Sequence, residues 1–381
     1  MNLRTPLRAA SASALMLGLG FAVVGTAGAS SRDFGSFGQR PALFVETDAS
    51  AGNSVLSYRQ ASDGTISFAG SYSTGGDGAT AAGASGGPAS QGALVLANDG
   101  ADLVATNPGS DTITVFAVDG THLTALQQLP SGGLFPDSVA TDGRLVAVLN
   151  AGGAGSVAEF QWFGNRLVPV PGQVRSLGLS NTTPPDFHHG PGQVGFSPNG
   201  QHLVVTTKLS TNAYEVFSVS NNGALGASPV VTTAVNALPF AFTFDAAGNL
   251  VAAEASNSSA TTYRVNSDGS LTSLGTVSDG GAALCWISGA NGYFFGSNAG
   301  SATVSSFTEN ASGAPVLVNA TAAKTTAGTI DSVVSPEGKF FYVEGGSSGT
   351  IDAFAIGSGG TLTPIETLFN IPVGSEGLAI S

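Results

Sequence analysis

One stretch of the chain decides the fold: Gly195-Phe196-Ser197-Pro198-Asn199-Gly200-Gln201-His202-Leu203-Val204-Val205-Thr206-Thr207. It contains a short apolar strand, a Gly-containing turn and a second apolar strand that ends in small or polar residues. A second clear copy of this phrase is Val333-Val334-Ser335-Pro336-Glu337-Gly338-Lys339-Phe340-Phe341-Tyr342-Val343-Glu344. A longer strand rich in Ser and Thr follows each copy, so the repeating unit consists of strands and turns alone.

The phrase occurs seven times. The second strand of each copy aligns on one apolar residue, namely Leu43, Leu103, Val146, Leu203, Leu250, Phe294 and Phe340. Neighbouring copies lie about 40 to 60 residues apart, which is typical of the blades of a β-propeller. Dipeptides such as Asp142-Gly143 and Asp268-Gly269 tolerate positive φ and close hairpins. We therefore predict an all-β, seven-bladed β-propeller that forms a single domain over residues 41–381.

The two ends of this domain are complementary. The last residues, Gly377-Leu378-Ala379-Ile380, resemble a first strand, whereas Ala42-Leu43-Phe44-Val45 resembles a second strand. We expect the N- and C-terminal strands to close one blade together, which removes the exposed edge of the ring.

The N-terminus has the pattern of a targeting segment. Arg4 and Arg8 precede an apolar run, and Ala27-Gly28-Ala29 supplies a small-residue cleavage site. This pattern predicts a secretory signal peptide over residues 1–29, followed by a short N-terminal segment over residues 30–40. The mature protein is then expected to be secreted or extracytoplasmic, and no other apolar run is long enough for membrane insertion.

Charge and cysteine content limit the partners. The formal net charge is −13, with 12 basic and 25 acidic residues, so the surface should repel nucleic acid. The only cysteine, Cys285, cannot form an internal disulfide, and its apolar neighbours indicate a buried structural thiol. We expect a monomer whose partner is a small-molecule ligand or an exported protein.

Ligands of propellers bind where the loops leading into the innermost strands converge. The residues expected just before those strands are Gln91, Asp137, Gln193, Phe240, Leu284, Asp331 and Glu376. Converging carboxylates can bind a cation or share a proton, whereas a single acid before a strand often caps a turn. A second ring, at the ends of the second strands, contains Glu254 and Glu344 among Asn and Thr residues.

Two spacings carry insertions. Residues 75–87 form a Gly/Ala/Ser tract that we interpret as a flexible surface loop. Residues 171–192 present Phe187, His188 and His189 on a proline-stiffened loop. Adjacent histidines need a further ligand, such as Asp137 or Glu254, to hold a metal. The metal ligands therefore stay unknown, and a divalent cation stays open as a cofactor of the protein.

The repeat phrase resembles one known family. Phe196-Ser197-Pro198-Asn199-Gly200 is similar to the S-P-D-G turn, and Asp102-Leu103-Val104-Ala105-Thr106-Asn107 to the L-Y-V-T-N strand, of the lactonase-family seven-bladed propellers. That family includes 6-phosphogluconolactonase and the fungal carboxymuconate cyclase. The resemblance covers Pro41 to Ser381 and implies chemistry on a cyclic ester.

The chain departs from the family at its functional positions. The H-x-H pair of the family is replaced by Gly190-Pro191-Gly192, and its P-R-H segment by Pro239-Phe240-Ala241. The acid of its N-E-L segment is matched by Glu254. Because the basic residues are lost, the resemblance does not extend to a phosphorylated sugar lactone as the substrate.

These observations leave two functional hypotheses. The first is a secreted lactonase-like hydrolase that opens, or in reverse forms, a small non-phosphorylated lactone at the channel mouth. Its candidate catalytic residues are Glu254, Asp137, Asp331 and Glu376, and its candidate substrate-binding residues are His188, His189, Gln193 and Glu344. The alternative is a non-catalytic propeller that binds a ligand, a cell-wall component or an exported protein, so whether the chain is an enzyme stays open.

Overall fold

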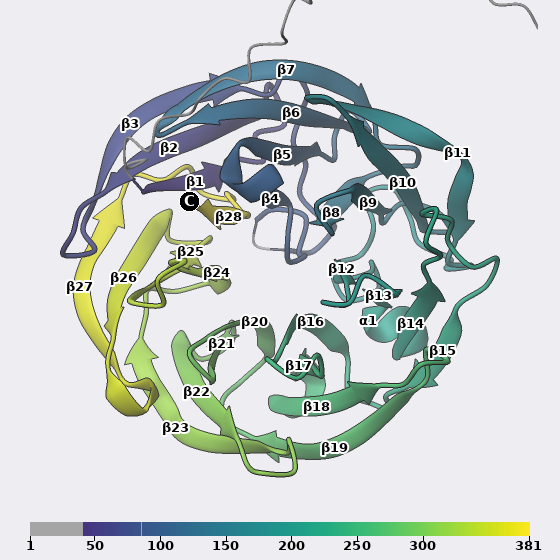
Figure 1. The fold of residues 1–381 in the computed structure, drawn as a ribbon. Coiled ribbons are helices and arrows are strands. Elements are labelled where there is room, and N and C mark those ends of the chain that lie inside the picture. The colour runs from purple at the N-terminus through teal and green to yellow at the C-terminus, as the bar shows by residue number, and fades with distance from the viewer. Residues whose placement is uncertain (1–40, 85) are drawn as a thin grey trace, which may run out of the picture. The chain divides into compact units, whose positions relative to one another are not determined.

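The computed structural model describes residues 41–84 and 86–381, and the expected signal peptide and short N-terminal segment lie outside these residues. The described chain folds into seven four-stranded antiparallel sheets that surround a central channel (Figure 1). The prediction of an all-β, seven-bladed propeller is therefore confirmed. Blade 1 is the sheet β28-β1-β2-β3, and blades 2 to 7 follow in chain order from β4-β5-β6-β7 to β24-β25-β26-β27.

Each blade runs outward from the channel. The innermost strands, in blade order, are β28 (Leu378–Ile380), β4 (Leu94–Ala97), β8 (Pro136–Thr141), β12 (Gln193–Phe196), β16 (Pro239–Phe244), β20 (Leu284–Ala290) and β24 (Thr329–Val334). The second strands are β1 (Ala42–Glu46), β5 (Asp102–Asn107), β9 (Leu145–Asn150), β13 (His202–Thr206), β17 (Leu250–Glu254), β21 (Tyr293–Asn298) and β25 (Phe340–Gly345). All seven aligned apolar residues lie in these second strands.

The outer half of each blade is longer and more polar. The third strands are β2 (Ser54–Gln60), β6 (Thr112–Asp119), β10 (Ser156–Phe163), β14 (Ala213–Ser218), β18 (Ser259–Val265), β22 (Thr303–Glu309) and β26 (Thr350–Ile356). The outermost strands are β3 (Ile66–Ser73), β7 (His122–Pro130), β11 (Arg166–Ser176), β15 (Val230–Thr233), β19 (Leu271–Ser278), β23 (Pro315–Lys324) and β27 (Leu362–Phe369).

Helical structure is confined to single turns. These are α1 (Lys208–Thr211) and the 3-10 turns η1 (Asn98–Gly100), η2 (Ala255–Asn257) and η3 (Ser358–Gly360). None of the helices within residues 41–84 and 86–381 has the length and apolar character needed to cross a membrane.

The ring closes through the two ends of the domain, as expected. The C-terminal strand β28 pairs antiparallel with β1, with Val45 opposite Leu378 and Leu43 opposite Ile380. Leu43, Leu378 and Ile380 are buried in one cluster with apolar residues of blade 7. The last strand of the chain therefore completes blade 1 and seals it against its neighbour.

The hydrophobic core lies between neighbouring blades. The strand β17 illustrates the reason, because successive side chains of a strand point to opposite faces. Leu250 and Ala252 pack with Tyr214 of blade 4, whereas Val251 and Ala253 pack with the aromatic and aliphatic residues of blade 6. This alternation also determines where a polar residue at the end of a second strand must point.

Candidate functional site

A cavity of about 550 Å³ lies at the mouth of the channel where the chain enters the innermost strands. Its walls come from the starts of innermost strands, the ends of second strands and both insertions. The lining residues are Gly83, Ala84, Gly86, Ala89, Phe187, His188, Leu209, Leu238, Phe240, Ala255, Ser256, Ala283, Cys285, Trp286, Ala299, Gly328, Ile330 and Glu376. A mostly apolar lining with a few polar groups is typical of small-molecule sites. We call this space the mouth cavity.

The apolar side of the mouth cavity belongs to blades 5 and 6. The rings of Phe240 and Trp286 lie 4.6 Å apart between centroids, at an interplanar angle of 53°. The indole N–H of Trp286 donates to the carbonyl of Ser90 at 2.7 Å, so the ring is fixed. Cys285 contributes a buried thiol to the same wall, and burial raises the pKa of this thiol to about 12. Cys285 is thus an unreactive lining residue, which agrees with the sequence-based interpretation.

Glu376 supplies the carboxyl group of the mouth cavity. Its Oε1 accepts the N–H of Ser90 at 2.6 Å and its Oε2 accepts the N–H of Ala89 at 3.0 Å. Burial raises the pKa of Glu376 to about 8, in spite of these two backbone donors. The group is therefore mostly protonated at neutral pH and can donate a hydrogen bond to a ligand.

The two insertions meet at the mouth. The N–H of Ala82 donates to the carbonyl of Pro185 at 2.8 Å, and the N–H of Phe187 donates to the carbonyl of Ala82 at 3.1 Å. Ala81 and Ala89 are buried in the core cluster of the mouth. The tract that we interpreted as a surface loop is exposed over part of its length, and its residues Gly83, Ala84 and Gly86 also line the mouth cavity.

The histidine pair is divided between the cavity and the solvent. His188 lines the mouth cavity, and burial lowers the pKa of its imidazole below the ordinary value. His189 is not among the lining residues, and its Nδ1 lies 2.8 Å from Oδ1 of Asp186 on the outside of the loop. The neighbouring rings of Phe187 and His188 are in contact, with centroids 3.6 Å apart.

A buried lysine lies directly behind the cavity wall. The ammonium of Lys208, at the start of α1, donates to the carbonyls of Ala89 and Phe187, both at 2.7 Å. It also lies 4.8 Å from the centroid of the Phe240 ring. The side chain is 1% exposed and is not itself part of the lining. Burial lowers the pKa of Lys208 to about 8.

The three acids expected at the channel have different surroundings. Asp331 accepts the N–H of Leu378 at 3.2 Å and thereby links blades 7 and 1, and burial raises its pKa to about 7. Glu376 links blade 1 to the segment that precedes blade 2. Asp137 is buried, and neither of its carboxylate oxygens accepts a hydrogen bond. Burial raises the pKa of Asp137, although the nearby positive charge of Lys208 lowers it in part. Only Glu376 of the three lines the mouth cavity.

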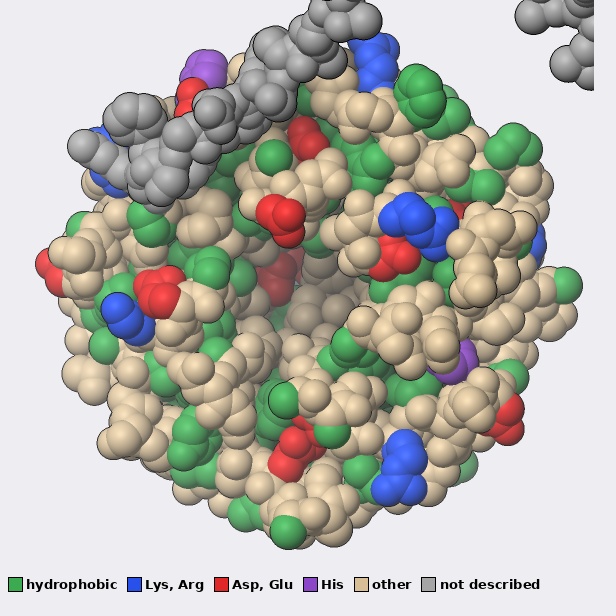
Figure 2. All heavy atoms as spheres, viewed as in Figure 1, with side chains coloured by type: hydrophobic (Ala, Val, Ile, Leu, Met, Phe, Trp, Pro, Cys, Tyr) green, Lys and Arg blue, Asp and Glu red, His purple; other side chains and the backbone are tan. Residues whose placement is uncertain are grey.

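Two glutamines form hydrogen bonds to innermost strands of other blades. The Nε2 of Gln91 donates to the carbonyls of Ile287 at 3.1 Å and of Phe242 at 3.3 Å. Oε1 of Gln193 accepts the N–H of Phe242 at 2.7 Å. Both glutamines line a further cavity of about 480 Å³ between the innermost strands, as does Asp331. Figure 2 shows one face of the ring, hollowed at its centre.

Glu254 lies between blades 4 and 5 and is not a lining residue of the mouth cavity. Its Oε1 accepts the hydroxyls of Tyr263 at 2.8 Å and Tyr214 at 3.1 Å, and its Oε2 accepts Thr261 Oγ1 at 2.8 Å. Period-2 alternation along β17 puts Glu254 on the face of Leu250, which explains this position. The arrangement favours a structural role, and the catalytic role stays a prediction.

Glu344 belongs to a buried acidic group around the closing strand. Its Oε2 accepts the N–H of Gly377 at 3.0 Å, and Oδ2 of Asp48 accepts the N–H of Glu376 at 3.1 Å. Burial raises the pKa of Glu344 and of Asp48 well above their ordinary values. These carboxyl groups hold the strand that completes blade 1. Glu344 is not a lining residue of the mouth cavity.

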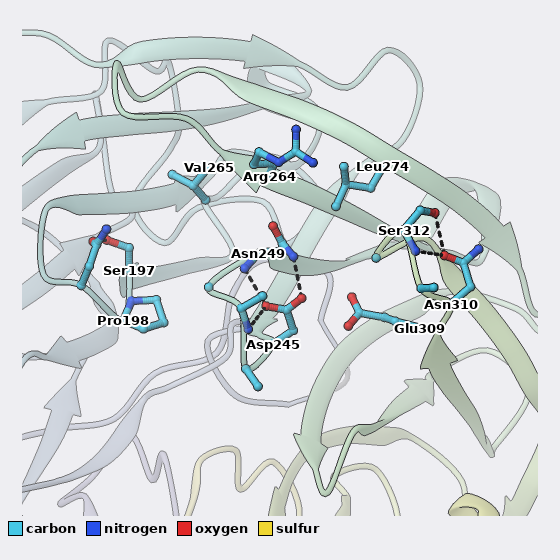
Figure 3. A pocket seen from close by; sticks show the side chains of 16 residues that line it. Ser197, Pro198, Asp245, Asn249, Arg264, Val265, Leu274, Glu309, Asn310 and Ser312 are labelled. Carbon is cyan, nitrogen blue, oxygen red and sulfur yellow. Dashed lines mark hydrogen bonds between the residues drawn. The ribbon is translucent and has the colours of Figure 1, made fainter.

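A larger, more polar cavity of about 800 Å³ lies among turns that join first to second and third to fourth strands (Figure 3). Oδ1 of Asp245 accepts the backbone N–H of Asn249, and its Oδ2 accepts the side-chain amide of that residue, both at 2.7 Å. Oδ1 of Asn310 likewise accepts the N–H of Ser312 at 2.9 Å. These polar groups stabilise the turns, so we place the functional site at the mouth cavity.

No metal centre is evident in the described part of the chain. Within residues 41–84 and 86–381, no three His, Cys, Asp or Glu side chains are arranged so that they could hold a metal ion. In particular, His189 bonds Asp186 and His188 faces the cavity, so the histidine pair does not converge on one point with Asp137 or Glu254.

The comparisons with known proteins agree with the fold. The sequence profile of the lactonase family of seven-bladed β-propellers matches residues 34–161. No curated protein matches the chain in sequence. The periplasmic gluconolactonase of Pseudomonas aeruginosa superposes with a TM-score of 0.69 at 21% identity, covering 89% of this chain and 98% of that one.

Two further solved structures have the same architecture. A Bacteroides uniformis protein described as a candidate 6-phosphogluconolactonase superposes with a TM-score of 0.70 at 19% identity, over 90% of this chain and 100% of its own. A Lactobacillus plantarum protein gives a TM-score of 0.70 at 19% identity, over 90% of this chain and 99% of its own. Likeness at these identities concerns the fold alone.

The ring of seven sheets and the cavity at its mouth define a seven-bladed β-propeller with a small-molecule type of pocket. The family profile matches residues 34–161 and the solved structures share the fold, so the resemblance to lactonase-family propellers expected from the repeat phrase is confirmed.

Sequence reasoning missed several residues of the site. It did not single out Lys208, because a lysine after a second strand resembles an ordinary surface residue. It included Trp286 only as a neighbour of Cys285. Their position in the repeat could have identified both residues. Each lies at the mouth end of a strand, and residues at the mouth ends of the other copies were already candidate site residues.

Proposed function

We propose that the protein is a hydrolase of small uncharged lactones that acts in the mouth cavity. One observation carries this proposal: among the described residues, the cavity lining contains an acid and a histidine but no lysine or arginine. A phosphate or carboxylate on the substrate would find no cationic partner in this lining. An uncharged cyclic ester fits both the apolar wall of Phe240 and Trp286 and the two polar groups opposite.

The reaction requires a base and an acid. With a lowered pKa, His188 is unprotonated at neutral pH and can take a proton from water as its oxygen attacks the lactone carbonyl carbon. Glu376, with a pKa of about 8, carries a proton that it can give to the ring oxygen as the acyl C–O bond breaks. The product is an open-chain hydroxy acid, and the proton held by His188 returns to Glu376 through solvent.

Turnover of matched lactones tests the proposal. The substrates are dihydrocoumarin and δ-valerolactone, which are uncharged, and 6-phosphogluconolactone, which is anionic, each followed in a pH-stat. We expect hydrolysis of the uncharged lactones only, with kcat reduced at least 100-fold by His188→Ala and by Glu376→Gln. The variant His189→Ala is the matched control and should retain activity, because His189 does not line the cavity. Equal loss in His189→Ala would contradict the assigned roles.

A binding protein without turnover is the second candidate. It is favoured by the surroundings of Glu254, the acid that matches the family pattern but lies outside the cavity and is bonded by four hydroxyl groups. Binding of δ-valerolactone without hydrolysis, measured by the fluorescence of Trp286 at the cavity wall, would support this candidate over the hydrolase. The other tryptophan, Trp162 in the outer part of blade 3, is the internal reference.

We also propose that the protein is exported and that residues 1–29 are removed. The Arg4 and Arg8 charges, the apolar run after them and the Ala27-Gly28-Ala29 site support this proposal. N-terminal sequencing of the protein from culture medium and from cell extract tests it. A mature chain that begins near Ser30 is expected, and an intracellular chain that retains Met1 would contradict export.

A further inference from the structure

Lys208 lies directly against the wall of the mouth cavity, yet its side chain is buried and is not part of the lining. Its ammonium contacts three groups, the carbonyl oxygens of Ala89 and Phe187 and the face of the Phe240 ring. All three of these residues line the cavity. The positive charge therefore lies behind a wall that is one residue thick.

The wall keeps the charge from direct contact with a ligand. An ammonium group and an anion attract each other most strongly when they form a direct hydrogen bond of about 2.7 to 2.9 Å. The ring of Phe240 lies between the Lys208 ammonium and the cavity and prevents such a bond to a bound anion. The two carbonyl oxygens occupy donors of the ammonium from other sides. The titratable groups that face Lys208 are Asp137, Glu376, Asp186, His188 and the Cys285 thiol.

We propose that Phe240 is a specificity-determining residue: its ring screens the Lys208 ammonium from the mouth cavity, so that the cavity takes uncharged, apolar-substituted ligands and rejects anionic ligands of the same shape. This inference rests on the proposed function of the cavity and names the substrate class of that site. The apolar substituent lies against Phe240 and Trp286, whereas the ester group faces Glu376 and His188.

Removing the ring tests the screen. The probes are methyl benzoate, an uncharged aromatic ester, and benzoate, its anionic counterpart, with affinities measured by isothermal titration calorimetry. Wild-type protein is expected to bind the ester at least tenfold more tightly than the anion. In Phe240→Ala the preference should shift at least tenfold towards benzoate, because the ammonium becomes accessible.

Two control variants separate screening from other effects. Phe240→Leu keeps an apolar barrier over the ammonium and should retain most of the wild-type preference. The double variant with Phe240→Ala and Lys208→Met should lose the gain in benzoate affinity. If benzoate affinity does not rise in Phe240→Ala, or if the rise persists in the double variant, the inference is overturned.

The inference stays testable if the Phe240 variants do not fold. Lys208→Met alone, in which methionine fills the site without charge, should change the ester-to-anion preference of the folded protein less than twofold, because the charge is already screened. A loss of benzoate binding in this variant larger than fivefold would overturn the inference. Failure of the wild-type protein to bind methyl benzoate would instead contradict the proposed function of the cavity.

Discussion

Tyr263 donates its hydroxyl hydrogen to the Glu254 carboxylate at 2.8 Å, and both side chains are buried. The bond joins two neighbouring strands of blade 5, while Tyr214 reaches the same carboxylate from blade 4 at 3.1 Å. Glu254 therefore holds two blades together through tyrosine hydroxyls at the position where the family pattern places a functional acid.

Glu254→Ala tests this structural role. The substitution removes the carboxylate that accepts the buried hydroxyl groups of Tyr214 and Tyr263, and we expect a loss of about 2 to 4 kcal/mol in the free energy of unfolding. Urea denaturation measures the loss. The turnover of each folded molecule should be unchanged, and a stable but inactive Glu254→Ala protein would return Glu254 to the list of catalytic residues.

The stability of the protein should fall as the pH rises from 5 to 8. The pKa of Glu376 is raised to about 8 and that of Asp331 to about 7, both by burial, above the ordinary values near 4. In this window the folded state binds more protons than the unfolded state. The stabilisation that the two protonated carboxyl groups contribute is therefore complete at low pH and is lost as the pH rises through their folded-state pKa values. Urea denaturation at pH 5 and pH 8 measures the difference.

Glu376→Gln provides the control for that pH dependence. The amide cannot ionise, so the decrease in stability between pH 7 and pH 8 should become smaller than in the wild-type protein. A stability that increases steadily from pH 5 to pH 8 in the wild-type protein would contradict the burial of these carboxyl groups.

Hydrolysis should have a bell-shaped pH dependence. The base requires neutral His188, whose pKa is lowered, and the acid requires protonated Glu376, whose pKa is about 8. The profile of kcat/KM on dihydrocoumarin should therefore rise below the ordinary histidine range and fall through about pH 8. Activity that continues to increase above pH 9, beyond the background hydrolysis of the lactone, would rule out Glu376 as the acid.

The C-terminal strand should be essential for folding. Ending the chain at Gly374 removes Leu378 and Ile380 from the core, and the loss of these two buried side chains alone costs about 3 to 6 kcal/mol. Because domains are stable by only about 5 to 15 kcal/mol, the truncated chain should be unfolded or aggregated. Deleting Ser381 alone is the matched control, since it removes only bonds to Ala42. Circular dichroism and gel filtration distinguish the outcomes.

The ring architecture could be predicted from the sequence because each of the seven copies of the repeat has the same pattern of strands and turns. The closure of one blade by the two terminal strands followed from their complementary strand types, and the register that places Leu43 opposite Ile380 came from the structure. The site was harder, because side chains from separate copies meet only in three dimensions. Glu254 was singled out by its residue type, although the alternation along β17 already pointed it between blades.

The insertions could not be placed from composition. Small residues in the 75–87 tract are equally compatible with an open loop and with a segment packed into the channel, and only contacts such as those of Ala82 with Pro185 and Phe187 decide between them. Lys208 is a similar case, because its ammonium bonds the carbonyl groups of Ala89, which follows the 75–87 tract, and of Phe187 in the 171–192 insertion.

The most direct test of the account is whether an uncharged lactone occupies the mouth cavity. Trp286 lines this cavity, so the change of its fluorescence on titration, with Trp162 in the outer part of blade 3 as the internal reference, reports on occupancy. Dihydrocoumarin and its lactam analogue 3,4-dihydroquinolin-2-one, which resists hydrolysis, are the ligands. We predict a saturable change in Trp286 fluorescence with both uncharged ligands and no change with 6-phosphogluconate. A fluorescence that neither uncharged ligand alters, or that the anion alone changes, would contradict the proposed occupancy of the mouth cavity.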